Sequence, residues 1–211
     1  MKKFGFTLAE VLITLTIIGV IAAITLPSIT ANVQKKSIGP TLAKAINNLE
    51  TSNRIIMQET GVMDLKSAIV KRVGADTNYY TELLETTLQG GLSNSNKTFT
   101  TKDGIAYTVS AQAKATTAAT PAVNALKDKY ACVYWVVDID TNGAGSSPNS
   151  PGYDQFKVYV DNFGAVIPYG GNEHNRYDTK TKVAADKGCS SALVNAACTG
   201  KIADSGWKVT Y

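Results

Sequence analysis

The sequence predicts an α+β fold in which a long N-terminal helix precedes a head built on an antiparallel sheet. From Phe6 to Leu26 run 21 residues whose only charged side chain is Glu10. After Pro27 the chain becomes polar, yet its apolar residues keep helical spacing. The later part of the chain alternates in short runs separated by turn residues. A helix followed by strands in this order is typical of the α+β class.

The apolar run is long enough to cross a membrane. A helix rises about 1.5 Å per residue, so the run spans roughly 30 Å, the thickness of one hydrocarbon core. A lone acid such as Glu10 costs a few kcal/mol near the bilayer centre and less towards an interface. We therefore expect Glu10 to have a specific partner. Two simpler interpretations are an anchor with an incidental acid and a secretory signal peptide cut near Ala22-Ala23, although the apolar run is long for such a peptide and contains an acid.

Residues 28–60 are predicted to form the amphipathic second half of the same helix, which packs on the head. A separate amphipathic helix is the alternative. We expect Gly39-Pro40 to kink or loosen the helix and Gly61 to end it. The apolar residues that recur at compatible intervals are Ile29, Val33, Leu42, Ile46, Leu49 and Ile56.

Residues 61–211 are predicted to form a globular α+β head with a C-terminal loop. Short helices are expected in residues 62–92, and the alternation around Asp103-Gly104 predicts a hairpin over Thr98–Val109. The other expected features are a surface loop at 110–121, a central strand at Cys132–Ile139, a second hairpin with strands Phe156–Val160 and Ala165–Pro168 around Asp161–Gly164, and a last strand at Trp207–Tyr211.

Charge and cysteine content narrow the range of functions. The formal net charge is +4 at pH 7 and no run of Lys or Arg exceeds two residues, so we predict no nucleic-acid partner. Cys189 and Cys198 lie nine positions apart and could close a short loop in an oxidising compartment, whereas Cys132 lies in an apolar run and is predicted to be a buried thiol. His174 is the single histidine. We find no catalytic arrangement and predict that the protein is not an enzyme.

The segment Lys2-Lys3-Phe4-Gly5-Phe6-Thr7-Leu8-Ala9-Glu10, followed by an apolar helix, resembles the prepilin segment of type IV pilins and type II secretion pseudopilins. The resemblance implies that residues 1–5 are a leader, cut between Gly5 and Phe6 by a prepilin peptidase that also N-methylates Phe6. It implies that residues 6–27 form a transmembrane and filament-core helix. Glu10 would be the assembly residue, and Pro27 matches a helix-kink proline at the end of the apolar half-helix.

Elementary electrostatics supports this role for Glu10. A free α-amine has a pKa of about 7.7–8.0 and is largely protonated at neutral pH. Cleavage after Gly5 would put this cation four residues from Glu10, so amine and carboxylate could pair between subunits. Removing one member of a buried ion pair typically costs about 3–5 kcal/mol, because the other charge is left uncompensated.

A possible ligand site follows the predicted central strand. The run Asp138-Ile139-Asp140-Thr141-Asn142-Gly143 matches the opening of an EF-hand loop, but Asn149 stands where that loop needs glutamate. Residues 138–168 instead resemble the tail of major pseudopilins, in which a loop binds calcium. That resemblance implies a Ca²⁺ site; the alternative is that these residues only make turns. The implied ligands are Asp140, Asn142 and Asp154, with Asp138 as a further candidate.

The expected function is a structural subunit of a type II secretion pseudopilus or a type IV pilus-like filament. The loop at 138–154 is typical of the pseudopilus branch, and the Cys189–Cys198 pair is more typical of the pilus branch. The resemblance implies as partners a prepilin peptidase/N-methyltransferase, copies of the chain and other pilin-like subunits, an inner-membrane assembly platform and membrane lipid. It implies one pass through the cytoplasmic (inner) membrane, with the head in a periplasmic or cell-surface filament. The alternative is a membrane-anchored periplasmic binding module that does not polymerise.

Overall fold

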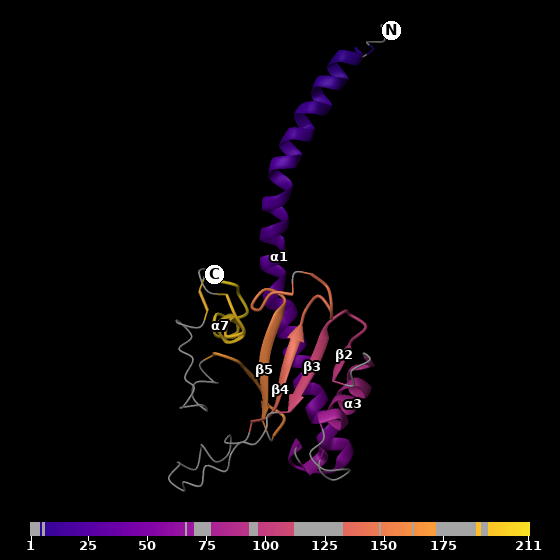
Figure 1. The fold of residues 1–211 in the computed structure, drawn as a ribbon, viewed down its shortest axis with the longest axis vertical. Helices are drawn as coiled ribbons and strands as arrows, with labels where there is room; N and C mark the ends of the chain where they lie inside the picture. The colour runs from indigo at the N-terminus through magenta and orange to yellow at the C-terminus, as the bar shows by residue number, and fades with distance from the viewer. Residues whose placement is uncertain are drawn as a thin grey trace. The chain divides into compact units, whose positions relative to one another are not determined.

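The computed structural model describes residues 5, 7–65, 67–69, 77–92, 97–111, 133–147, 149–161, 163–171, 189–190 and 194–211. The chain forms two compact units, Met1–Ser37 and Ile38–Tyr211. The predicted α+β class is confirmed (Figure 1). The helices are α1 (Leu8–Thr60), α3 (Thr77–Leu88) and α7 (Cys198–Asp204), and the strands are β1 (Gly91–Leu92), β2 (Thr98–Thr100), β3 (Ala106–Ala111), β4 (Val133–Asp140), β5 (Gln155–Asp161) and β6 (Val166–Pro168).

In the first unit, α1 contains a span of membrane-crossing length and composition, Leu8–Pro27, no part of which is buried against the rest of the protein. Its polar hydroxyls are satisfied within the helix. Thr14 donates to the carbonyl of Val11 across 2.9 Å, and Thr25 donates to that of Ile21 across 2.9 Å. Hydroxyls that bond to their own helix avoid the cost of an unpaired polar group in hydrocarbon.

The helix α1 continues through Gly39-Pro40, where we expected a kink or a loosening. Gly39 has a packing role instead, because a Cβ at this position would collide with the backbone carbonyl of Trp207. Glycine therefore lets the C-terminal segment lie directly against the helix backbone. The predicted end at Gly61 is confirmed: Gly61 has a φ of 66°, and the N–H of Val62 donates to the carbonyl of Met57 across 3.2 Å.

The six strands form one antiparallel sheet in the order β1-β2-β3-β4-β5-β6, so each strand pairs with the next one along the chain. Both predicted hairpins are confirmed. Phe99 lies opposite Tyr107 in the first hairpin, and Tyr159 lies opposite Ile167 in the second. The predicted central strand is also confirmed as β4, which lies between β3 and β5.

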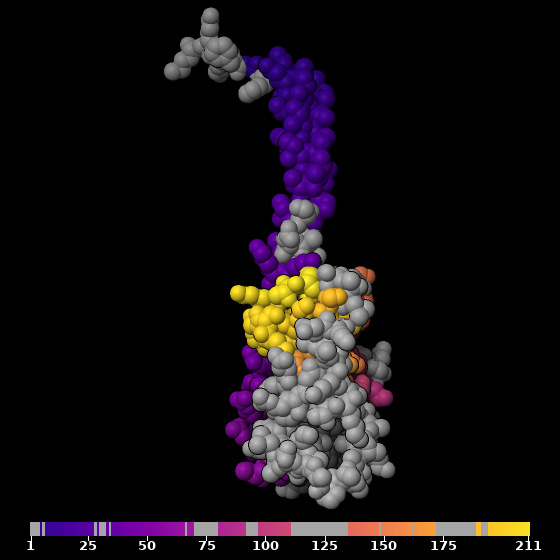
Figure 2. All heavy atoms as spheres, turned by 90° about the vertical axis from the view of Figure 1, so that its left-hand side faces the viewer, coloured from indigo at the N-terminus to yellow at the C-terminus, as the bar shows by residue number. Residues whose placement is uncertain are grey.

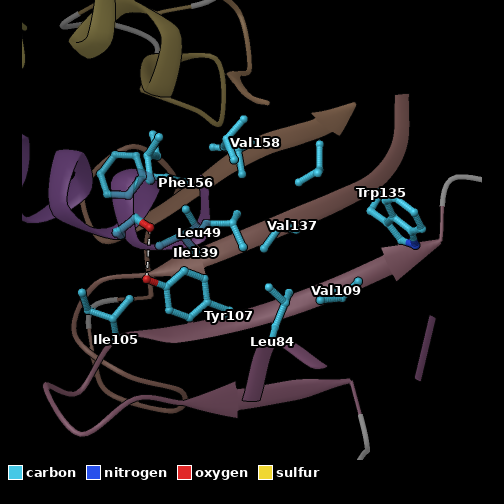
Figure 3. Close-up of a cluster of buried hydrophobic side chains, with 14 of the residues drawn as sticks. Leu49, Leu84, Ile105, Tyr107, Val109, Trp135, Val137, Ile139, Phe156 and Val158 are labelled. Atoms are coloured by element: carbon cyan, nitrogen blue, oxygen red, sulfur yellow. Dashed lines mark hydrogen bonds between the residues drawn. The ribbon is translucent and has the colours of Figure 1, made fainter. Parts of the chain in front are cut away.

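The core of the second unit lies between one face of the sheet and the helices α1 and α3 (Figures 1 and 3). Alternate residues of each central strand point to this face, as period-2 patterning requires. Leu49 from α1 and Leu84 from α3 are fully buried in it. The hydroxyl of Tyr107 donates to the carbonyl of Ala45 across 3.2 Å, which bonds the sheet to α1. The sheet residues in the core include Tyr107, Val109, Trp135, Val137, Ile139, Phe156, Val158 and Val160.

The predicted strand at Trp207–Tyr211 is wrong. α7 ends just before it, and Gly206 and Trp207 both have a positive φ, 67° and 62°, with the N–H of Trp207 bonded to the carbonyl of Ile202 across 2.9 Å. This helix-ending geometry turns the backbone away from an extended path. The aromatic and β-branched residues that suggested a strand pack on the core instead, and the hydroxyl of Tyr211 donates to the carbonyl of Gly152.

Some sequence-based expectations fall outside the described residues. They are the buried thiol Cys132, the histidine His174, and most of the loop at 110–121, whose first two residues belong to β3.

Candidate functional site

The start of α1 is a reciprocal hydrogen-bonded cap between Thr7 and Glu10. The backbone N–H and the hydroxyl of Thr7 both donate to Glu10 Oε2, each across 2.8 Å. In return, the N–H of Glu10 donates to Thr7 Oγ1 across 3.3 Å. A Thr at the N-cap with a Glu three residues later is a capping box. Thr7 is not among the site residues expected from the sequence, although its T-x-x-E spacing with Glu10 before an apolar run was a readable signal.

This cap gives Glu10 a partner within its own chain. It places the carboxylate in the first turn, where the positive end of the helix dipole stabilises negative charge. Both bonds to the carboxylate end on Oε2, so Oε1 can accept a further donor. Glu10 is exposed in the single chain, as is every described side chain around it in the first turn. The site can therefore bind a cationic donor supplied from outside the chain.

The other residues implied by the prepilin resemblance lie at or near this end of the chain. Gly5 is exposed, and a Cβ at this position would meet nothing within 4 Å. Phe6 lies outside the described residues. Pro27 is the last residue of the membrane-length span, and α1 continues beyond it.

Of the four expected calcium ligands, Asp138 is set apart from the other three because it forms an ion pair with a lysine of the neighbouring strand. It lies in β4 opposite Lys157 of β5, whose Nζ is 3.2 Å from Asp138 Oδ1. Asp140 ends β4, and its Oδ1 accepts the N–H of Asn142 across 3.2 Å. Burial, the larger cause, and the nearby charge of Asp154 both raise the pKa of Asp140. A cation at this position would offset both effects.

Asp154 organises the loop that joins β4 to β5. Asp154 is buried, with 4% of its surface exposed. It accepts the N–H of Asn149 across 2.6 Å, the N–H of Ser150 across 2.5 Å and the side-chain amide of Asn142 across 3.1 Å. These three donors satisfy the carboxylate oxygens with hydrogen bonds from the protein. Calcium is coordinated by oxygen atoms. Here the carboxylate oxygens of Asp154 accept N–H groups of the protein instead.

Asp140, Asn142 and Asp154 thus share one loop, while Asp138 is paired elsewhere. Within the part of the chain that the structure describes, no three His, Cys, Asp or Glu side chains gather closely enough to hold a metal ion. Calcium binding at this loop stays a prediction, and Asp154 has a structural role that does not depend on it.

The C-terminal segment is fastened by a disulfide between Cys189 and Cys198. Cys198 is the first residue of α7, and Lys201 of the same helix donates to the carbonyl of Cys189 across 3.0 Å. The hydroxyl of Thr199 accepts the N–H of Lys157 across 3.0 Å, which bonds α7 to β5. In the space-filling view the C-terminal segment (yellow) forms a continuous surface on this unit (Figure 2).

A cavity of about 440 Å³ opens on the sheet face opposite the core. Its polar lining includes Thr108, Asp138, Asp140, Gln155 and Lys157. The charges of Asp138 and Lys157 pair with each other inside it. The volume of the cavity is in the range of cavities that hold small ligands.

Comparison with known protein families identifies the N-terminal segment. Residues 1–26 match the family model described as the prokaryotic N-terminal methylation motif. This match includes Gly5, Phe6 and Glu10 and ends before the head, so it does not extend to the expected likeness of residues 138–168 to major pseudopilins. No curated protein and no solved structure matches the chain.

Proposed function

Because residues 1–26 form a type IV pilin-like prepilin segment, we propose that the chain is a structural subunit of a filament of the type IV pilus or type II secretion pseudopilus kind. In this proposal a prepilin peptidase cuts between Gly5 and Phe6, and the new amine is methylated. Before assembly, the subunit spans the cytoplasmic membrane once and its head lies outside the cytoplasm. An assembly platform then adds it to other pilin-like subunits.

The observation that carries the proposal is the combination of the cap at Glu10 with the apolar span that follows. A helix that is apolar on all sides has to be buried in lipid or among other helices. No part of Leu8–Pro27 is buried within this chain. The span therefore requires an outside environment, which is lipid before assembly and neighbouring helices afterwards.

Glu10 provides the specific contact between copies in this account. Thr7 occupies Oε2 from within the chain, and Oε1 accepts the protonated amine of Phe6 from a neighbouring subunit. Hydrogen bonds between ionised partners are roughly twice as strong as neutral ones. In this account each copy gives its amine to one neighbour and its carboxylate to another, and such a head-to-tail contact that does not close on itself builds an open filament.

Two features of the head bear on the choice between pilus and pseudopilus. The disulfide-closed C-terminal loop supports a pilus subunit. The expected calcium loop supports a pseudopilus subunit, but Asp154 already has three protein donors. Together, these two features favour a pilus subunit over a pseudopilus subunit. Calcium binding by the purified protein would favour the pseudopilus.

The second candidate function is a membrane-anchored binding module that does not polymerise, and the cavity of about 440 Å³ is the observation that favours it. Electron microscopy separates the two. We expect filaments sheared from cells that overproduce the chain, with its assembly machinery present, to be labelled by an antibody against the head. Labelling confined to membranes, in cells that make other filaments of this kind, would favour the binding module.

A further inference from the structure

The turn between β5 and β6 contains a buried carboxylate that is only half satisfied. Asp161 is 1% exposed. Its Oδ1 accepts the N–H of Phe163 and the N–H of Ala165, each across 2.8 Å, and so shapes the turn. Its Oδ2 is buried and has no hydrogen-bond partner among the residues that the structure describes. Buried carboxylate oxygens are normally hydrogen-bonded, so an unpartnered one requires a physical explanation.

The same turn is fixed to the helices on the inner face of the sheet. The amide of Asn53 in α1 donates to the carbonyl of Gly164 across 2.9 Å. Its Oδ1 accepts the hydroxyl of Tyr80 from α3 across 2.7 Å. A Cβ on Gly164 would lie 2.9 Å from the Cβ of Asn53, so the turn and the helix backbone are in close contact. The turn beside Asp161 is therefore attached to α1 by a hydrogen bond and by close packing.

Among the described residues, the charged group close to Asp161 is an acid, which destabilises the ionised form of Asp161. From α1 the charged neighbour is Glu50, which accepts the N–H of Val166 across 3.4 Å and has Arg54 at 3.6 Å from its other carboxylate oxygen. From α3 the titratable group is Tyr80, and burial raises its pKa so that it stays neutral. The strand β4 places Val133 opposite Asp161. Burial, the largest cause, and the charge of Glu50 therefore raise the pKa of Asp161.

We propose that Asp161 is a proton-binding site of the head, and that its protonation as the pH falls stabilises the β5–β6 turn. A neutral carboxyl group is buried at much lower cost than a carboxylate. Protonation at Oδ2 removes the unsatisfied charge and leaves Oδ1 free to keep both backbone bonds of the turn. Repulsion from Glu50 falls at the same time.

The direction of the pH effect follows from linkage. The folded state raises the pKa of Asp161 above its ordinary value of 3.8, so the folded state binds the proton more tightly than the unfolded chain does. The contribution to stability is complete below the unfolded pKa and is lost as the pH rises through the folded pKa. Asp161 therefore makes the head more stable as the pH falls towards the unfolded pKa, whether or not the chain assembles.

Thermal unfolding of the full chain in detergent tests the proposal, with Tm measured by near-ultraviolet circular dichroism between pH 4 and pH 8. We expect the Tm of the wild type to rise relative to that of Asp161→Asn as the pH falls. The folded chain binds this proton more tightly than the unfolded chain does. For every tenfold difference between these two proton affinities, the Tm should rise by about 3 °C. Parallel Tm profiles for wild type and Asp161→Asn would overturn the proposal.

Asp103→Asn is the matched control for this experiment, because Asp103 also lies in a hairpin turn. Lys44 at 2.6 Å lowers the pKa of Asp103 to about 2, so it does not titrate between pH 4 and pH 8. The difference in Tm between this control and the wild type should therefore stay constant from pH 8 to about pH 5. It should shrink towards pH 4, where the unfolded chain begins to bind the proton, which is opposite in sign to the effect expected for Asp161.

Glu50→Gln provides a second test that does not depend on the folding of Asp161→Asn. This variant keeps an oxygen that can accept the N–H of Val166 but removes the like charge beside Asp161. The pH at which stability falls should therefore move to a lower value than in the wild type. An infrared band of a buried protonated carboxylic acid should move with it. An unchanged midpoint, or the absence of this band from the wild type at pH 4, would contradict the proposal.

Discussion

Thr7 donates two hydrogen bonds, one from its backbone N–H and one from its hydroxyl, to a single carboxylate oxygen of Glu10, each across 2.8 Å. This relationship explains how a lone acid is accommodated at the start of an apolar span. The acid has donors in its own chain and lies at the end of the span rather than at the centre, where its cost would be highest. The other carboxylate oxygen can accept a donor from a neighbouring subunit.

Replacing Glu10 tests the pairing between subunits. Glu10→Ala leaves the amine of a neighbouring subunit without its counter-ion, at a cost of about 3–5 kcal/mol for each buried contact. We expect the sheared filament fraction to fall at least about tenfold, measured by quantitative immunoblotting. The disulfide-containing head should keep the protease resistance of the wild type.

Glu59→Ala is the matched control for this variant, because Glu59 is an exposed acid near the other end of the same helix. Its filament yield should equal that of the wild type. A normal yield from Glu10→Ala would remove the carboxylate from the assembly mechanism.

Thr7→Ala tests the cap itself. Loss of a Thr N-cap costs about 1 kcal/mol, so the first turn of α1 should open more often. Amide hydrogen exchange of the chain in micelles should accelerate about fivefold at Glu10, whose N–H loses its acceptor. Thr7→Ser keeps the hydroxyl and should exchange at the wild-type rate. Equal rates in all three proteins would show that the cap does not hold the first turn.

Gly39→Ala tests the contact between α1 and the C-terminal segment. A Cβ at this position would collide with the carbonyl of Trp207, and such overpacking typically costs about 1–3 kcal/mol. We expect a lower Tm for the full chain in detergent. Gly91→Ala serves as the control, since a Cβ there meets nothing within 4 Å. Similar Tm values for the two variants would mean that the C-terminal segment moves aside without cost.

The calcium prediction is tested by the Tm of the same preparation in calcium and in EDTA. A site filled at 100 times its Kd would stabilise the head by about 2.7 kcal/mol, and Asp140→Asn should abolish the increase. Magnesium should not replace calcium, because it requires a more regular octahedral shell. Identical Tm values in calcium and EDTA would leave the donors to Asp154 as the full explanation of the loop.

Local patterns in the sequence predicted the elements whose conformation depends on residues close together in the chain. Apolar spacing predicted the long helix, and Asp103-Gly104 predicted the first hairpin because Gly104 can adopt its φ of 84°. The strand predicted at Trp207–Tyr211 failed because α7 had not been recognised, and the positive φ at Gly206 and Trp207 that ends this helix redirects the chain.

Tertiary contacts decided the features that the sequence did not predict. The amide of Asn53 bonds to Gly164, 111 residues away in the sequence, and no local pattern indicates that contact. Two of the three donors to Asp154 are backbone N–H groups, which depend on the path of the loop and could not be read from side-chain types. Thr7 was the exception, because its T-x-x-E spacing with Glu10 was a readable signal.

Mass spectrometry of the N-terminal peptide, from protein recovered from membranes, tests the central claim most directly. We expect a peptide that begins at N-methylated Phe6, which would establish prepilin processing and put a free amine four residues from Glu10. An intact Met1 would indicate an anchored protein without processing, and a terminus near Thr25 would indicate a secreted one. Either of these results would contradict the role assigned to Glu10.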